Sequence, residues 1–381
     1  MKTRFIVSGA KSACLMDAAH IIRSGGLVVF PTETVYGLGG DATNAESAKK
    51  IYAAKGRPSD NPLIIHIDRP ESAEPYAVTN EYYYRLAEKF MPGPLTVILP
   101  RKDTIPKETA GGLDTVAVRC PSHPIAHAFI EACGVPVAAP SANLSGKPSP
   151  TNAADVLADM DGRVDMIIDG GDSEIGLEST IVKLDGDCGI LLRPGAVTVD
   201  ALRCVLREVK VDPAVTGSLP ADAHPLSPGM KYRHYSPDTP LVLLDGNDSD
   251  VLEFMKQTSD DAILICFDDE AAVLAGHRII PVGSREDLSE EAHRLFSALR
   301  MADRMGAKVI YGHLPKKDGI GLALYNRMIR AAAHTVRKVQ QFNSKRKGAS
   351  AMRRLRSYKW QRKSPQKQTI RSSTPSRPIS P

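Results

Sequence analysis

The sequence predicts an α/β protein with two domains, and three observations support this fold class. Short apolar runs that suit strands alternate with longer segments of helical periodicity along most of the chain. The 381 residues suffice for about two domains of roughly 150 residues each. Hydrophobic residues make up 42% and charged residues 24%, which are ordinary proportions for a soluble globular protein. No apolar stretch reaches the roughly 18 residues of a membrane-spanning helix, so we expect no membrane partner.

Residues 1–207 are predicted to form a strand-rich α/β domain. Residues 12–24 carry apolar side chains at helical spacing, and Gly25 and Gly26 can end that helix. Further helices are expected at 45–54, at 80–90 and, with Thr151 as the N-cap, up to Met160. Strands are expected at Leu27–Phe30, Leu63–Ile67, Leu95–Leu99, Thr115–Val118, Val137–Ala139, Met166–Asp169, Ser179–Leu184 and Ile190–Arg193.

A linker and a second α/β domain are predicted to follow. Residues 208–237 are rich in Pro and Gly towards their end, and a linker of this length is usually functional or disordered. The alternation in 238–343 predicts a small parallel sheet with helices on both faces. Its expected strands are Leu241–Leu244, Ala262–Cys266, Ile279–Val282 and Val309–Tyr311, and its expected helices are 249–257, 287–304 and 321–338.

The remaining segment, 344–381, is a strongly basic tail. It holds twelve Lys or Arg and no Asp or Glu, whereas the 37 basic and 44 acidic side chains of residues 1–343 give a net charge of −7. Such a composition predicts a solvated, disordered extension. Tyr358 and Trp360 lie among the cations, so RNA contact through charge and stacking is the alternative interpretation.

The cysteines and the N-terminus indicate a cytoplasmic protein. No long apolar segment and cleavage site follow Met1, so we expect no secretory signal. None of the six cysteines forms a CxxC pair, and scattered thiols of this kind suit a reducing compartment better than a disulfide framework or a zinc site. They are Cys14, Cys120, Cys133, Cys188, Cys204 and Cys266.

Several familiar motifs are absent or weak. The sequence has no GxxxxGK[ST] phosphate loop and no GxSxG nucleophile elbow. Gly37–Gly40 only faintly resembles a dinucleotide-binding fingerprint, and a glycine turn is the favoured interpretation. His123 and His127 have the spacing of one helix face, but no third ligand is nearby, which favours a structural pair over a metal site.

Three polar segments that follow predicted strands or helices carry the functional signal. Residues 30–38 place two hydroxyls, a carboxylate and a phenol after a strand, where α/β sheets often bind ligands, although a polar turn is the alternative. Lys55 and Arg57 follow a helix and suit an anion such as a triphosphate, although cations there can simply balance the helix dipole. Residues 139–150 are dense in hydroxyl and amide groups that could hold phosphate or ribose oxygens, or could form a hydrogen-bonded turn.

These segments closely resemble motifs of the Sua5/YrdC/YwlC family, the threonylcarbamoyl-AMP synthases. The likeness covers about residues 8–340, with the motifs in the family's order. The motifs are PTETVYGL at 31–38, KxR at 55–57, NPLIIHI at 61–67, MPGPLT at 91–96, TVAVR at 115–119, PSAN at 140–143, ESTIV at 178–182 and LLRPGAV at 191–197. SPGMKYRHYSP at 227–237 and GIGLALYNRMIRAA at 319–332 resemble the long two-domain Sua5 form, whereas the basic tail departs from the family.

The resemblance implies a fold and a reaction. The fold would be a YrdC-like twisted α/β domain around a positively charged cavity, followed by a smaller Rossmann-like Sua5 domain. The reaction would join L-threonine, bicarbonate or CO2 and ATP into L-threonylcarbamoyl-adenylate and pyrophosphate. A separate transferase complex would then use the adenylate to modify adenosine 37 of tRNAs that read ANN codons. A Mg2+ ion is expected with ATP, held mainly by phosphates and water rather than by a protein metal site.

The resemblance also implies roles for particular residues. Lys55 and Arg57 match the KxR pair and would hold phosphate oxygens, and Ser141 and Asn143 match an SxN pair that would orient phosphate or carbamate. Tyr235 in the linker matches a position that reaches back over the nucleotide, so the linker would act as a lid. The other ATP-side positions are Ser59, Thr115, Ser149 and Arg193, and the threonine-side positions are Thr32, His66, Arg119, Ala139 through its backbone, and Ser179.

Two other functions are weighed against this one. A basic cavity could belong to an RNA-binding module without catalysis, but such a module has no need of a threonine pocket. A carbamoyltransferase is the second alternative, because YrdC-like domains occur in larger carbamoylating enzymes. Those enzymes need additional domains that this sequence lacks.

Overall fold

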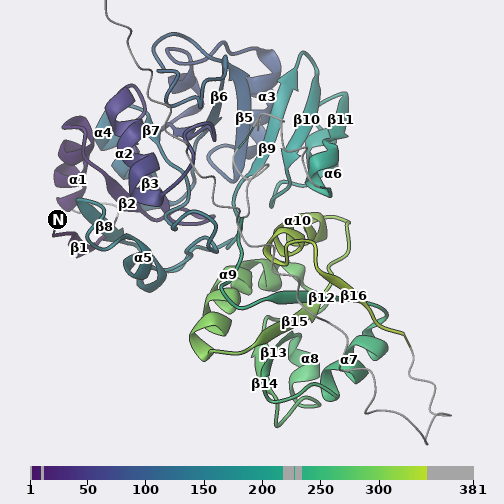
Figure 1. The fold of residues 1–381 in the computed structure, drawn as a ribbon. Coiled ribbons are helices and arrows are strands. Elements are labelled where there is room, and N and C mark those ends of the chain that lie inside the picture. The colour runs from purple at the N-terminus through teal and green to yellow at the C-terminus, as the bar shows by residue number, and fades with distance from the viewer. Residues whose placement is uncertain (1, 10–12, 218–226, 228–233, 341–381) are drawn as a thin grey trace, which may run out of the picture. The chain divides into compact units, whose positions relative to one another are not determined.

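Two β-sheets organise the computed structural model of the chain (Figure 1). The structure describes residues 2–9, 13–217, 227 and 234–340, so the basic tail lies outside the described residues. The described residues belong to one compact unit spanning Met1–Gln340. The first sheet has eleven strands and the second has five. Among the described residues no helix is long and apolar enough to cross a membrane.

The first sheet mixes parallel and antiparallel pairs, as expected for the first domain. Strands β4 and β6 run parallel with His66 opposite Arg119, so both strands end at the same edge of the sheet. In sheet order the strands are β1 (Arg4–Val7), β8 (Met166–Asp169), β2 (Val28–Phe30), β3 (Gly37–Asp41), β7 (Val137–Ala138), β4 (Ile64–His66), β6 (Thr115–Arg119), β5 (Leu95–Pro100), β9 (Thr180–Asp185), β10 (Cys188–Arg193) and β11 (Glu208–Val211).

Both faces of the first sheet are covered by helices. Alternation along β2 sends Val29 into one core and Val28 and Phe30 into the other, as strand geometry requires. The helices α1 (Cys14–Arg23) and α4 (Pro124–Cys133) cover one face. The other face packs against α2 (Ala45–Lys55), α3 (Glu81–Phe90), α5 (Ala153–Met160) and α6 (Val199–Arg203), and the short 3-10 helices are Pro70–Ala73 and Pro213–Val215.

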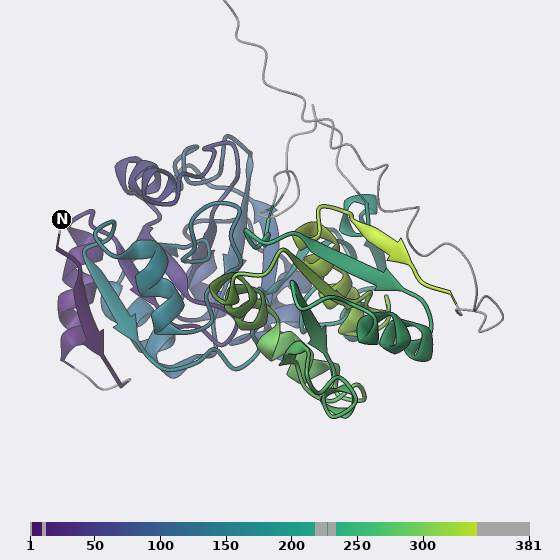
Figure 2. The same cartoon turned by 60° about the horizontal axis from the view of Figure 1, so that its bottom comes forward.

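The second sheet is parallel throughout, which confirms the predicted architecture of the second domain (Figures 1 and 2). One face packs on α9 (Leu288–Met305) and α10 (Gly321–Ala331), and the other on α7 (Asp248–Lys256) and the segment around α8 (Asp268–Ala271). In sheet order the strands are β14 (Arg278–Pro281), β13 (Ala262–Cys266), β15 (Val309–His313), β12 (Leu241–Asp245) and β16 (Val336–Lys338).

Helix α9 also contacts the first domain. Val35 and Leu177 of the first domain share a core with apolar residues of α9 and α10. Gly176 lies against the α9 backbone with a φ of +78°, and a Cβ there would approach the Cα and the carbonyl oxygen of His293 to 2.5 Å. Only glycine therefore allows this close approach.

Some predicted elements differ from the structure. Gly37–Asp41 forms β3 rather than a turn and pairs with β2 and β7. Its glycines allow close packing, since a Cβ on Gly39 would lie 2.8 Å from Val137. The N-cap of α5 is Asn152, whose side chain accepts from Asp155 N, and not Thr151. The last helix ends at Ala331, and part of its predicted range forms β16.

Other elements were absent from the prediction. Helix α4 buries the face formed by Ile125, Ala126, Phe129, Ile130 and Cys133, but its other positions carry few polar side chains, so the sequence shows little contrast between the faces. His123 serves as its N-cap by accepting from Ile125 N. The predicted linker begins with β11, which pairs with β10. The remaining unpredicted elements are β1, α6 and α8.

We predict that Gly176→Ala destabilises the protein by about 1–3 kcal/mol more than a control substitution, because the methyl group must displace α9. The control is Gly186→Ala, since Gly186 also has a positive φ of +57° but no atom within 4 Å of a Cβ. Midpoints of denaturant unfolding measure both effects. Equal destabilisation by the two variants would contradict the importance of this contact.

Candidate active site

A pocket at the edge of the first sheet gathers most of the predicted site residues. It is lined by the segment after β2, the end of α2, strands β4 and β6, the loop after β7, and residues just before the second sheet. The predicted residues in its lining are Thr32, Lys55, Arg57, His66, Arg119, Ala139, Ser141, Asn143, Ser149, Arg193 and Tyr235. Three predicted residues, Ser59, Thr115 and Ser179, are not part of the lining.

These three residues occupy different surroundings. Ser59 is exposed in the loop after Arg57. Thr115 begins β6, whereas Arg119 in the pocket ends that strand. Ser179 is buried behind the lining, where its hydroxyl bonds to Thr96 Oγ1 at 2.7 Å and accepts from Arg193 at 3.1 Å. Ser179 therefore supports a pocket residue instead of facing the pocket directly.

Local sequence fixes the position of the Lys55 and Arg57 pair. The Asn44 side chain caps α2 by accepting from Glu46 N. The helix ends at Gly56, which has a left-handed conformation with a φ of 61°. The chain reverses there, so Lys55 remains on the last helical turn and Arg57 begins the following loop. Both side chains line the pocket.

Lys55 holds the loop 139–150, which follows β7. Its Nζ donates to the carbonyls of Ser141 and Asn143, the latter at 2.5 Å. The Ser141 hydroxyl donates to Asn143 Oδ1 at 2.6 Å. Burial, followed by the positive charge of Arg57, holds the pKa of Lys55 well below its usual value. The three residues thus form one connected group on one side of the pocket.

Three cations that line the pocket form no ion pair with a carboxylate of the described residues. Arg57 donates to the carbonyls of Asn61 and Pro62, and Arg193 to the carbonyl and hydroxyl of Ser179. In the described part of the chain no carboxylate forms an ion pair with Lys55, Arg57 or Arg193. Burial lowers the pKa of each arginine to about 10. An anionic ligand would therefore relieve an electrostatic cost already present.

A second, smaller polar group lies around Arg119. Its Nη2 donates to Glu33 Oε1 at 2.8 Å, and both side chains are buried. Within the described residues, Arg119 Nε and Glu33 Oε2 are buried and have no hydrogen-bond partner. Arg119 lines the pocket, so its unpartnered Nε is a donor for a ligand there.

His66 and Thr32 border the Arg119 group. His66 Nδ1 lies 3.3 Å from the carbonyl of Val137, and burial together with Arg119 lowers the pKa of His66 to about 3. His66 is therefore neutral at physiological pH. Thr32 donates to the carbonyl of Val35 at 2.6 Å and thereby shapes the turn after β2.

The pocket-lining residues that escaped the sequence-based prediction of the site include Glu178 and His234. Glu33, which pairs with the lining residue Arg119, was also missed. Glu33 and Glu178 belong to the motifs at 31–38 and 178–182, so their motif membership was the available signal. Glu178 accepts from Ser149 at 2.5 Å and from Arg327 of α10 at 2.8 Å. Burial opposes ionisation of Glu178, but Arg327, Arg193 and Ser149 hold its pKa below the usual value.

The predicted linker residue Tyr235 reaches the pocket. Its backbone has a φ of 62°, which is unusual for a residue other than glycine. Its ring stacks on Phe296 of α9 with the centroids 5.3 Å apart. His234 beside it also lines the pocket, and burial holds the pKa of His234 well below its usual value. Residues at the end of the predicted linker thus contact both the pocket and the second domain.

The described residues contain no group of three or more His, Cys, Asp or Glu side chains that could hold a metal ion. The pocket offers cations, hydroxyls and amides, which suit an anion better than a metal.

Comparisons with sequence families agree with this geometry. Residues 20–195 match the Sua5/YciO/YrdC family, described as telomere recombination, and residues 197–333 match the family described as threonylcarbamoyl-AMP synthase, C-terminal domain. A threonylcarbamoyl-AMP synthase of Pyrococcus abyssi is 42% identical over 334 residues, covering 84% of this chain and 95% of the relative. One from Bacillus subtilis is 41% identical over 327 residues, covering 84% and 94%.

A solved structure shows the same fold. Pyrococcus abyssi Sua5, in a crystal structure complexed with L-threonine, matches with a TM-score of 0.81 at 39% identity. The match covers 89% of this chain and 100% of that chain.

We predict that burial of neutral His66 makes stability fall as the pH is lowered from 7 to 5. The unfolded state gains a proton below the ordinary pKa of 6.5, whereas folded His66 does not until about pH 3. One such group contributes about 2 kcal/mol over this range. The His66→Gln variant should therefore show a correspondingly smaller pH dependence in denaturant unfolding. A dependence equal to that of the wild type would contradict the prediction.

Proposed function

Because the chain belongs to the Sua5/YrdC family of threonylcarbamoyl-AMP synthases, it is a nucleotidyl-transferring enzyme, and we propose that its substrates are L-threonine, bicarbonate or CO2 and ATP. The products are L-threonylcarbamoyl-adenylate and pyrophosphate. The observation that carries this proposal is the set of cations beside the loop 139–150, with Lys55 and Arg193 buried and Arg57 half-buried, which have no carboxylate ion-pair partner among the described residues.

The proposed reaction has two bond-forming steps. The threonine amine first condenses with bicarbonate, which gives a carbamate and releases water. A carbamate oxygen then attacks the α-phosphorus of ATP, the bond from that phosphorus to the bridging oxygen of the β-phosphate breaks, and pyrophosphate leaves. No covalent bond to the protein is needed, so positioning and stabilisation of negative charge supply the catalysis.

The nucleotide is assigned to the Lys55 side of the pocket. Lys55, Arg57 and Arg193 would bind phosphate oxygens and stabilise the charge that develops on the transferring phosphorus. Ser141 and Asn143 would orient phosphate or carbamate oxygens, and Ser149 would contribute a further hydroxyl. Tyr235 would lie over the nucleotide and exclude water from the product, which is prone to hydrolysis.

Threonine is assigned to the Arg119 side. L-Threonine carries a carboxylate, which Arg119 can bind through its unpartnered Nε. Glu33 Oε2 has no hydrogen-bond partner among the described residues and would accept from the amine or the hydroxyl of the amino acid. The Pyrococcus abyssi relative was crystallised with L-threonine, which supports this substrate. Mg2+ is proposed to arrive with ATP and to neutralise part of the phosphate charge.

The adenylate is proposed to serve tRNA modification. It would supply the threonylcarbamoyl group for N6-threonylcarbamoyladenosine at position 37 of tRNAs that read ANN codons, through a separate transferase complex. This role and the scattered thiols place the enzyme in the cytoplasm in our proposal.

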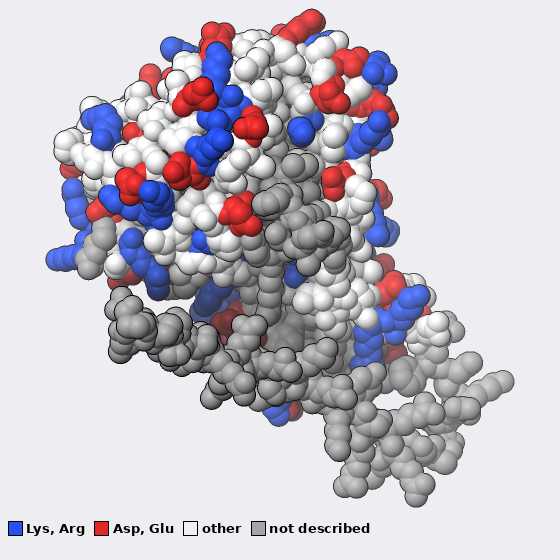
Figure 3. Space-filling model, turned by 45° about the horizontal axis from the view of Figure 1, so that its top comes forward, with Lys and Arg blue, Asp and Glu red and all other residues white. Residues whose placement is uncertain are grey.

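RNA contact by the basic tail is a second proposed interaction. On the face drawn in Figure 3, basic and acidic side chains of the described residues are interspersed, so they offer no surface of a single sign there. The twelve cations of residues 344–381 are the strongest attraction for a polyanion in the sequence. Binding of tRNA by the full chain, compared with a chain ending at residue 343, tests this interaction.

We predict that pyrophosphate release requires ATP, L-threonine and bicarbonate together. L-Serine should support slower release, because it keeps the hydroxyl and loses only a methyl contact. Release without an amino acid would contradict the proposed function and indicate a simple nucleotide hydrolase. The assay needs only the purified full-length chain and a coupled pyrophosphate readout.

Lys55→Ala or Arg57→Ala should reduce this release about 100-fold or more, because each removes a charge aimed at the transferring phosphate. The matched control is Lys49→Ala on the same helix, since Lys49 is exposed and donates to Glu46. Circular dichroism spectra establish that the variants fold. Wild-type turnover in a folded Lys55→Ala protein would remove Lys55 from the mechanism.

Arg119→Lys should weaken L-threonine binding about 10- to 100-fold, because lysine keeps the charge beside Glu33 but lacks the second donor of the guanidinium fork. Binding of a non-hydrolysable ATP analogue should change less than twofold. Isothermal titration calorimetry measures both affinities. An unchanged threonine affinity would place the carboxylate elsewhere.

A further inference from the structure

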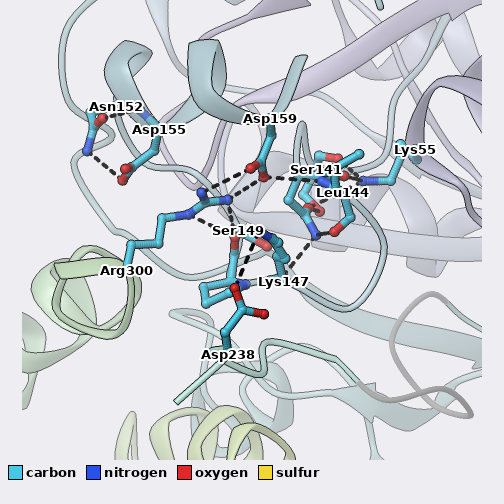
Figure 4. Close-up of polar contacts among 12 residues, drawn as sticks. Lys55, Ser141, Leu144, Lys147, Ser149, Asn152, Asp155, Asp159, Asp238 and Arg300 are labelled. Carbon is cyan, nitrogen blue, oxygen red and sulfur yellow. Dashed lines mark hydrogen bonds and ion pairs between the residues drawn. The ribbon is translucent and has the colours of Figure 1, made fainter. Parts of the chain in front are cut away.

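A buried arginine of the second domain forms hydrogen bonds with the loop 139–150. Arg300 lies on α9 and is 7% exposed. Its guanidinium donates twice to the carbonyl of Pro148, from Nε at 3.1 Å and from Nη2 at 2.6 Å. It also donates to the Asp159 carboxylate, with Nη2 at 2.7 Å from Oδ2 (Figure 4). Arg300 thus contacts the loop directly at the carbonyl of Pro148.

Asp159 gives Arg300 a second connection to the same loop. This carboxylate lies on α5 and is 5% exposed. Its Oδ2 also accepts from Leu144 N at 3.2 Å. Next in the chain, Asn143 Nδ2 donates to the carbonyls of Leu144 and Lys147, at 2.8 and 2.9 Å. Figure 4 shows the whole path, which runs from Arg300 through Asp159 and Leu144 to the group formed by Ser141 and Lys55.

We propose that Arg300 is a positioning residue for nucleotide binding, which holds the Ser141–Ser149 segment in its binding conformation through Asp159 and the Pro148 carbonyl. The inference rests on the proposed function, because it assigns this segment to ATP. Without Arg300, Asp159 becomes a buried carboxylate with no ion-pair partner, and Pro148 loses both donors. The loop would relax, and Ser141 and Asn143 would lose their alignment with Lys55.

A neighbouring ion pair provides a control that distinguishes an effect on the loop from an effect on the contact between the domains. Arg304, one turn further along α9, donates to Asp155 of the same helix α5 at 2.7 Å. Among the described residues, neither side chain of that pair forms a hydrogen bond or an ion pair with the loop 139–150, and the Arg304 side chain is 60% exposed. Arg304→Ala therefore removes a link between the same two helices while leaving the loop anchors in place.

The experiment compares Arg300→Ala, Arg300→Lys and Arg304→Ala in the full-length chain. Calorimetry measures the affinity for a non-hydrolysable ATP analogue and, separately, for L-threonine, and the pyrophosphate assay gives KM and kcat. We expect Arg300→Ala to weaken analogue binding and to raise the KM for ATP at least tenfold, with threonine affinity changed less than twofold. Arg300→Lys should recover part of the loss, because lysine can satisfy one of the two acceptors. Arg304→Ala should stay within twofold of the wild type throughout.

Asp159→Asn provides an independent variant in which the helix packing is less disturbed. If Arg300 acts through Asp159, the double variant Arg300→Ala/Asp159→Asn should bind the analogue with an affinity within twofold of that of Arg300→Ala alone. Three results overturn the proposal: analogue affinity of Arg300→Ala equal to that of Arg304→Ala, equal losses for the analogue and for threonine, or independent losses in the double variant. Failure of the proposed function is distinguishable, because it leaves the wild type without threonine-dependent pyrophosphate release.

Discussion

Buried positive charge without carboxylate partners is the constraint on which the site depends. Lys55, Arg57 and Arg193 line one pocket, and in the described residues they bond to carbonyls and hydroxyls instead of to acids. Carbonyl dipoles offset part of the burial cost, yet the pKa of Lys55 still falls. Such an arrangement is relieved by an anion, so part of the binding energy for phosphate is built into the pocket. A site with acids beside these cations would be more stable and would bind phosphate less well.

Two acids at the nucleotide side of the pocket are instead paired with arginines of the second domain. Glu178 contacts Arg327, and Asp159 contacts Arg300, and all four side chains are buried. Breaking a buried pair by removing one partner costs about 3–5 kcal/mol. Each of these carboxylates also bonds to the loop 139–150, through Ser149 and Leu144 N respectively. The second domain thus satisfies the buried charges that shape the nucleotide side of the pocket.

The sequence predicted what local patterns encode. Strand β13 matches its prediction, because a run of apolar residues bounded by polar ones has one good interpretation. The motif matches grouped Ser141 with Lys55, and the structure places the Ser141 carbonyl in contact with Lys55 Nζ. Strand β3 was missed because its glycines are dictated by packing against distant residues. The Asp159 partner of Arg300 lies 141 residues away in sequence, so no local signal could assign this arginine to the site. Arg327 belongs to the motif at 319–332, so motif membership was the available signal for it.

The separation of roles between the domains has a physical reason in the proposed chemistry. A loop that carries Ser141 and Asn143 must be rigid to orient oxygens in a transition state, but loops that follow strands are intrinsically mobile. The Lys55 bonds fix one side of the loop, yet Lys55 must also be free to respond to phosphate charge. Anchors on the opposite side, at Pro148 and Leu144, supply rigidity without using the cations that face the ligand. A second domain is a suitable source of such anchors, because its arginines approach from outside the pocket and leave the pocket open to substrate.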